Sequence, residues 1–177
     1  MNIELYIDEI LNQINAANQA LDSSNDLFTN HHRFLIHCTV IHKILFPSKH
    51  LLRKEEKNIA LEREDEFKKY FSECQEINNN TDIQKFRNHF EHLDTRMDKY
   101  FNRDKKLVVD KNISDRDLGD YIKIGGQPLS NEVSNEDKFR NFEAGKLTFM
   151  GESFDTNVAK KWIDAIKNYI ILKRQNT

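Results

Sequence analysis

Hydrophobic positions recur every three to four residues along most of the chain, which is the period of amphipathic helices. Residues 2–22 and 156–173 each carry such a stripe. Residues 27–46 differ, because they are apolar on nearly every face from Phe34 onward. A helix of this kind is usually central in a bundle. Pro47 ends it, since proline cannot continue a helix.

Two more helices are expected between these segments. Residues 49–73 have a helical pattern but are highly charged. The segment Thr81–Phe101 opens with T-x-x-Q, which predicts a capping box at its start. Seven of its apolar residues fall on one narrow helical stripe. They are Ile83, Phe86, Phe90, Leu93, Met97, Tyr100 and Phe101.

The helical pattern dissolves before the last helix. Residues 139–151, "FRNFEAGKLTFMG", are typical of two short strands around an Ala-Gly turn. The sequence therefore predicts a mainly α fold, a helical bundle of four to five helices. A small β-hairpin and loop excursion, at about residues 102–150, precedes the C-terminal helix. We expect residues 1–177 to form a single domain.

Composition narrows the class of protein. With only 5 Gly and 2 Pro in 177 residues, long helices are favoured. The net charge of −2 excludes a polycation, so any contact with nucleic acid has to be a local patch. Cys38 and Cys74 lack CxxC spacing, which indicates neither a disulfide framework nor a zinc knuckle. No signal peptide and no run of about 20 apolar residues is found, so we expect a cytoplasmic protein away from membranes.

Candidate chemistry is concentrated in "QKFRNHFEHLDTRMDKYF", residues 84–101. Arg87 and His92 are predicted to flank a polar groove. Its floor would be formed by Asn88, Glu91 and Thr95. Histidine exchanges protons near neutral pH, and arginine presents a planar fork to phosphate oxygens. The plain structural alternative is a surface pair of Arg87 with Glu91 beside a solvated His92.

The stretch "RNHFEH" resembles the R-x(4–6)-H signature of HEPN domains, in which a polar residue such as Asn follows the Arg. The longer block "FRNHFEHLDTRMDKYF" looks like one found in uncharacterised bacterial HEPN-like proteins. No other Arg of the chain has a His five to seven residues downstream. The resemblance implies a helical domain that dimerises so that two motifs face each other and RNA enters the shared cleft.

The resemblance also implies a metal-independent endoribonuclease of a toxin or phage-defence type, with an antitoxin or other protein as partner. Carried over by position, Arg87, Asn88 and His92 would be catalytic. Glu91 and His89 would support them, and whether His89 or His92 is the working histidine stays open, although spacing favours His92. The alternative is a non-catalytic HEPN-like module that binds a nucleotide, RNA or a protein partner.

Other sites find little support in the sequence. His31, Cys38 and His42 can share a helix face, and His89 and His92 are three residues apart, which is compatible with metal ligands. However, no Glu stands three residues before any His, so the pattern of di-iron bundles is missing. The glycine pair in "GDYIKIGGQP" lacks the GK[ST] of a P-loop. We therefore expect no metal and no cofactor.

Overall fold

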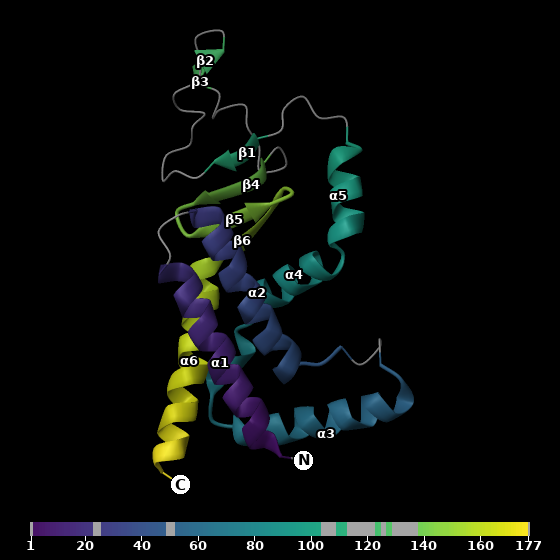
Figure 1. Cartoon of the computed structure of the whole chain (residues 1–177), viewed down its shortest axis with the longest axis vertical. Coiled ribbons are helices and arrows are strands. Elements are labelled where there is room, and N and C mark those ends of the chain that lie inside the picture. Colours follow the sequence, from purple (N-terminus) through teal and green to yellow (C-terminus); the bar gives the residue numbers. More distant parts are fainter. Residues whose placement is uncertain are drawn as a thin grey trace.

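The structure, a computed structural model of the whole chain, is mainly helical (Figure 1). It describes residues 2–22, 26–48, 52–103, 109–112, 123–124, 127–128 and 138–176, with backbone alone in the three short ranges. Within these ranges there are six α-helices and a short 3-10 helix. They are α1 (Ile3–Asp22), α2 (Leu27–Leu45), α3 (Lys54–Tyr70), η2 (Gln75–Asn78), α4 (Thr81–Glu91), α5 (Leu93–Phe101) and α6 (Thr156–Gln175).

A sheet lies across one end of the helices (Figure 1). Its strands are β1 (Val109–Asn112), β4 (Lys138–Glu143), β5 (Lys146–Phe149) and β6 (Glu152–Asp155), in that spatial order. β4, β5 and β6 are antiparallel, and β1 runs parallel to β4. β2 (Lys123–Ile124) and β3 (Gln127–Pro128) pair separately. The prediction of a mainly α fold with a β excursion before the last helix is confirmed.

Two tight turns connect the antiparallel strands. Ala144 and Gly145 join β4 to β5, and Met150 and Gly151 join β5 to β6. All four have positive φ, at 48°, 78°, 49° and 80° respectively. Positive φ at both central residues is the mark of the type I′ turn, whose twist matches that of paired strands. The predicted hairpin around Ala144 and Gly145 is thus confirmed, and a third strand extends it.

The core is formed where α1, α2 and α6 pack together and meet the sheet. α2 begins at the N-cap Asp26, whose carboxylate accepts a hydrogen bond from the Thr29 backbone N–H at 3.1 Å. The largest fully buried side chain is Trp162, whose Nε1 donates to the Ile77 carbonyl at 3.0 Å. These contacts join the last helix to the segment just before α4.

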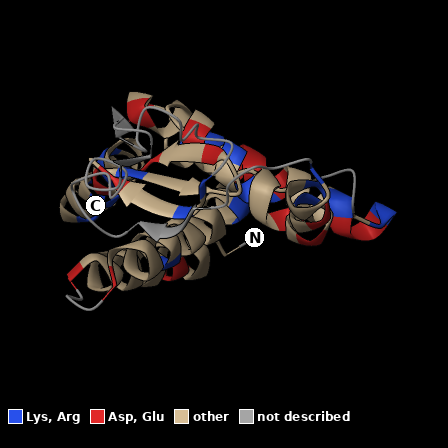
Figure 2. Cartoon of the chain, turned by 90° about the horizontal axis from the view of Figure 1, so that it is seen from above, with Lys and Arg blue, Asp and Glu red and all other residues tan. Residues whose placement is uncertain are grey.

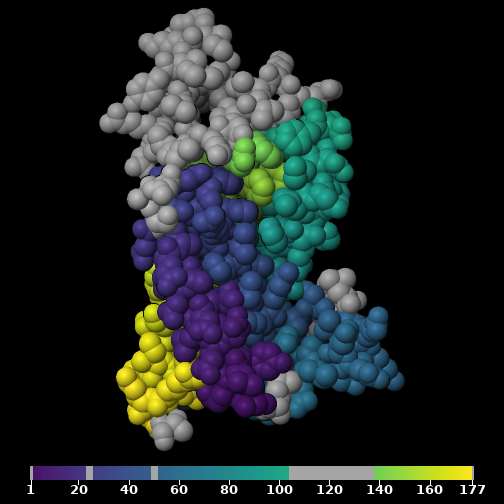
Figure 3. All heavy atoms as spheres, viewed as in Figure 1, coloured from purple at the N-terminus to yellow at the C-terminus, as the bar shows by residue number. Residues whose placement is uncertain are grey.

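α3 projects away from the other helices (Figures 1 and 3). Only Ala60 and Phe67 of this helix are buried, and Ile59 is 53% exposed. Its C-terminal end is held because the Tyr70 carbonyl accepts hydrogen bonds from the side chains of Tyr169 and Lys173. Acidic and basic side chains alternate over the projecting part (Figure 2), as expected for a solvated helix.

The one long helix predicted over residues 81–101 is instead two helices that meet at His92. The backbone there has φ −116° and ψ 32°, outside the helical region. The break turns α5 toward the sheet, where the Tyr100 ring lies 5.5 Å from that of Phe139 and Arg96 pairs with Glu152. A straight helix could not make these contacts, so tertiary packing overrides the local pattern.

Several boundary predictions are also wrong. Asn80 is the N-cap of α4 and makes no side-chain cap hydrogen bond, so the predicted capping box does not form. α3 starts at Lys54, later than the predicted residue 49, and residues 49–51 lie outside the described ranges. Most of residues 102–137, the first part of the excursion predicted at about 102–150, also lies outside the described ranges. None of the described helices combines the length and the hydropathy that crossing a membrane requires.

Replacing Phe86 tests the core where α4 meets the sheet. This side chain is fully buried, and its ring lies edge-on to that of Phe154 at 5.0 Å. We expect Phe86→Ala to lower the free energy of unfolding by about 3–5 kcal/mol, because it leaves a cavity. The control Leu5→Ala, at a residue that is 68% exposed, should change it by at most about 0.5 kcal/mol. Urea denaturation measures both, and equal effects would contradict the packing described here.

Candidate functional site

Arg87 lies where α4 crosses the C-terminal end of α2, and it is only 5% exposed. Its Nε donates to Glu91 Oε1 at 3.2 Å, and its Nη1 donates to the Phe46 carbonyl at 2.7 Å. Nη1 also lies 3.2 Å from His42 Nδ1, and Nη2 donates to the hydroxyl of Ser48. The buried cation is therefore held by four neighbours, which a guanidinium with five N–H donors can serve at once.

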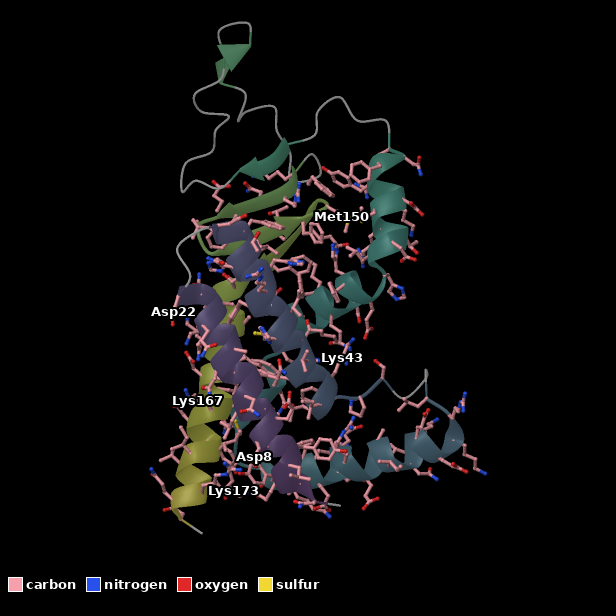
Figure 4. All side chains as sticks on the ribbon, in the orientation of Figure 1. Asp8, Asp22, Lys43, Met150, Lys167 and Lys173 are labelled. Atoms are coloured by element: carbon pink, nitrogen blue, oxygen red, sulfur yellow. The ribbon has the colours of Figure 1, made fainter. Side chains whose placement is uncertain are left out.

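Glu91 provides the counter-charge for this cation. Its Oε1 is 3.2 Å from Arg87 Nε and 3.0 Å from Lys43 Nζ, and Lys43 lies on the side of α2 that faces α4 (Figure 4). Partial burial acts to raise the pKa of the Glu91 carboxyl, but hydrogen bonds from Lys43 and Arg87 prevail and hold it below its ordinary value. Glu91 is thus the ionised link between α4 and α2.

His42 is neutral in this arrangement. Burial and then the neighbouring Arg87 cation lower its pKa to about 4, although Asn80 and Glu91 act in the opposite direction. Because a guanidinium can only donate, Nδ1 of His42 must accept the hydrogen bond from Arg87. The ring proton is therefore on Nε2. A histidine held in one tautomer orients the cation beside it rather than exchanging protons at neutral pH.

An open cleft of about 660 Å³ begins beside this cluster. The end of α2, the start of α3 and the middle of α4 form its walls. The lining is His42, Phe46, Pro47, Ser48, Lys57, Gln84, Arg87 and Asn88. The cleft therefore combines two cations with amide and hydroxyl groups, a set suited to phosphate oxygens.

The structure brings some of the predicted site residues together and separates others. Arg87 and Asn88 both line the cleft, and Glu91 pairs with Arg87. His92 lies at the helix break with an exposed side chain, one helical turn beyond Asn88. His89 is 1% exposed and faces the sheet, with its ring centroid 5.3 Å from those of Phe149 and Phe154. On α4 it is therefore on the side opposite to Arg87.

Two neighbours of Arg87 could not be assigned from the sequence. His42 is 45 residues from Arg87 in the chain, and the pattern indicates only that it belongs to a buried helix. Ser48 follows Pro47 and looks like a cap for the next helix, yet α3 begins at Lys54 and the Ser48 hydroxyl binds Arg87 instead. In the described part of the chain, no three His, Cys, Asp or Glu side chains gather as a metal ion would require.

Comparisons with known proteins do not place the chain in a family: no family model, no curated protein and no solved structure matches it. The HEPN resemblance therefore rests on the residues of the motif alone.

The neutral state of His42 makes the stability of the protein depend on pH. The folded pKa of about 4 lies below the ordinary value of 6.5, so the unfolded chain binds more protons between these values. Stability is thus expected to fall as the pH drops from 6.5 toward 4. In His42→Gln, the side-chain oxygen can still accept from Arg87. The slope of the free energy of unfolding against pH should decrease in this variant by the contribution of about one bound proton.

Urea denaturation of both proteins across this pH range measures the difference. Burial also lowers the pKa values of His31 and His32 to about 4, but these two contribute equally in wild type and variant. An unchanged pH dependence in His42→Gln would mean that His42 is not the neutral acceptor described here.

Proposed function

We propose that the chain is a HEPN-like domain that acts as a metal-independent endoribonuclease, with two copies forming one RNA cleft. The observation that carries this proposal is the location of Arg87 and Asn88 in an open polar cleft, with His92 exposed one helical turn away. The cleft is large enough for part of an RNA strand, and Lys57 adds a second cation to its lining.

The residue types fit RNA cleavage by the 2′-hydroxyl. In this reaction the bond from the 2′ oxygen to phosphorus forms and the bond from phosphorus to the 5′ oxygen breaks. One proton leaves the 2′-hydroxyl, and one reaches the 5′ oxygen that departs. His92 would carry out one of these transfers as general acid or base. Arg87 would stabilise the extra negative charge on the phosphorane, and Asn88 would orient the phosphate.

A second copy is part of the proposal because one chain does not join these groups. Among the described contacts of Arg87, none reaches His92. A two-fold axis beside Asn88 would bring the exposed His92 of one protomer to the cleft of its partner. The proposed biological setting, a toxin or phage-defence system with an antitoxin or other protein partner, follows from the resemblance of the motif.

A second candidate function is favoured by a specific observation. Four of the five N–H donors of Arg87 are engaged by groups of its own chain, so a phosphate that binds two of these donors has to replace one partner. A non-catalytic HEPN-like module, which binds RNA, a nucleotide or a protein partner at the cleft rim, needs no such exchange. It would show salt-dependent RNA affinity without cleavage.

Replacing His92 tests the nuclease directly. His92→Ala should lower the rate of RNA cleavage by about 10²–10⁴-fold, since it removes the proton-transfer group. The side chain is exposed, so the melting temperature should be nearly unchanged. Asp94→Ala, an exposed change on the next helix, serves as the matched control. The assay uses a fluorogenic single-stranded RNA, its 2′-deoxy counterpart as a substrate that must stay intact, and EDTA, which should have no effect.

Mixing two inactive variants tests whether the site spans two copies. Arg87→Lys keeps the buried charge but loses the planar pair of N–H donors. This variant protein is mixed with the His92→Ala protein, and the mixture is partially unfolded and refolded so that subunits exchange. About a quarter of the wild-type activity should return, because half of the dimers are mixed and each then has one intact site. No recovery, with dimers demonstrated, would rule out the shared site. RNA binding without any cleavage by wild type would select the binding module.

A further inference from the structure

A second cavity, of about 210 Å³, lies between α5 and the turn from β5 to β6. Met150 and Gly151 of that turn form one wall, and Met150 faces α5 in Figure 4. The other described residues that line it are His89, Arg96, Lys99, Tyr100, Arg103 and Glu152. Because His89 and Arg87 are on opposite sides of α4, this cavity is separate from the Arg87 cleft.

On α5 and the two residues that follow it, cationic and acidic residues lie on different faces. Arg96, Lys99 and Arg103 are spaced so that all three line the cavity. Asp94 and Asp98, at about 100° per residue, fall on the opposite side of the helix. The three cations therefore face the cavity, whereas the two acidic residues of α5 lie on its other side.

Glu152 offsets only one of these charges. It is the sole carboxylate among the described residues that line the cavity, and it pairs with Arg96. Lys99 and Arg103 are exposed, and no hydrogen bond or ion pair is found for either within the described ranges. The described residues that line the cavity therefore carry two more positive than negative charges.

His89 gives a second and independent indication of a ligand. Its side chain is 1% exposed, and Nδ1 lies 3.3 Å from Glu152 Oε2. Neither Nδ1 nor Nε2 has a hydrogen-bond partner among the described residues. Buried polar atoms are nearly always paired, by protein, water or a bound molecule. Because His89 lines the cavity, a hydroxyl of a bound molecule would be able to pair with one of its ring nitrogens.

We propose that this cavity binds the phosphate group of a phosphate ester. Lys99 and Arg103 would contact its oxygens, and Arg96, held by Glu152, would form the third side. The cavity, at about 210 Å³, is smaller than the roughly 300–1,000 Å³ typical of sites that enclose a whole ligand. It therefore suits a phosphate with an adjoining hydroxylated sugar, the rest of the ligand lying outside.

Phosphate binding can be measured without any cleavage assay. Titration calorimetry of the whole chain with inorganic phosphate at low ionic strength is expected to give saturable binding, with sodium chloride at equal ionic strength as the blank. The variant Lys99→Gln/Arg103→Gln should bind at least about tenfold more weakly, because charge-assisted hydrogen bonds are lost. Lys69→Gln/Lys167→Gln, on α3 and α6, removes the same charge away from the cavity and should bind like wild type.

Two results would overturn the proposal. One is the absence of saturable phosphate binding by wild type, and the other is an equal loss in the control variant, which would indicate diffuse charge only. Arg87→Lys separates this site from the nuclease cleft. If phosphate binding disappears in Arg87→Lys and persists in Lys99→Gln/Arg103→Gln, the anion site is the cleft and not this cavity.

Competition then identifies the source of the phosphate. A single-stranded oligoribonucleotide that displaces inorganic phosphate from wild type indicates an RNA backbone or end, whereas displacement by ribose 5-phosphate but not by the oligonucleotide indicates a small phosphorylated sugar. Both results require the displacement to vanish in Lys99→Gln/Arg103→Gln. Displacement that persists in that variant would contradict the assignment to this cavity.

Discussion

The position of α4 against the end of α2 depends on the buried guanidinium of Arg87. It joins α4 to the carbonyl of Phe46 at the C-terminal end of α2, where the helix dipole favours a cation. A charge buried to this degree is tolerated only if it is paired and hydrogen-bonded. Glu91 provides the pairing, and His42 and Ser48 complete the hydrogen bonds. Because these groups come from α2, α4 and the segment between α2 and α3, one side chain sets how these elements meet.

The same hydrogen bonds compete with the phosphate contact that the proposed chemistry requires of Arg87. A phosphate can accept from two N–H donors of Arg87 only if it replaces one of the four partners, and Glu91 and the Phe46 carbonyl are part of the helix packing. The Ser48 hydroxyl lies beyond the end of α2 and lines the cleft, so it is the partner whose exchange disturbs the fold least. A nuclease would thus bind its substrate by exchanging the Ser48 hydroxyl for a phosphate oxygen. A binding module would leave this hydrogen bond in place.

The two faces of α4, which ends at the break at His92, have different surroundings. On one side of α4 lies the Arg87 cleft, and on the other lies a layer of rings in which His32, His89, Phe86 and Phe149 are in contact. Burial lowers the pKa of His89, and burial together with His89 lowers that of His32 to about 4. These histidines therefore behave as neutral aromatic residues in the core. By turning α5 toward the sheet, the break also forms the cavity lined by Lys99 and Arg103.

Local patterns determined the fold class. The stripes of residues 2–22 and 156–173, the apolar segment that ends at Pro47 and the turn at Ala144 and Gly145 all depend on interactions between residues near each other in sequence. Such interactions can be recognised in one dimension. The candidate residues Arg87 and Asn88 were also found in this way, because they follow from a short motif.

Only the tertiary structure decided how those residues are used. The break at His92, the burial of Arg87, its contact with His42 and the pairing of Arg96 with Glu152 join residues up to 56 positions apart. Contacts between residues so far apart produce no periodic pattern in the sequence. The break at His92 forms because packing of α5 on the sheet outweighs the local preference for a continuous helix. The motif identifies the candidate residues, whereas the packing of α4 against α2 and the sheet determines which of them face solvent.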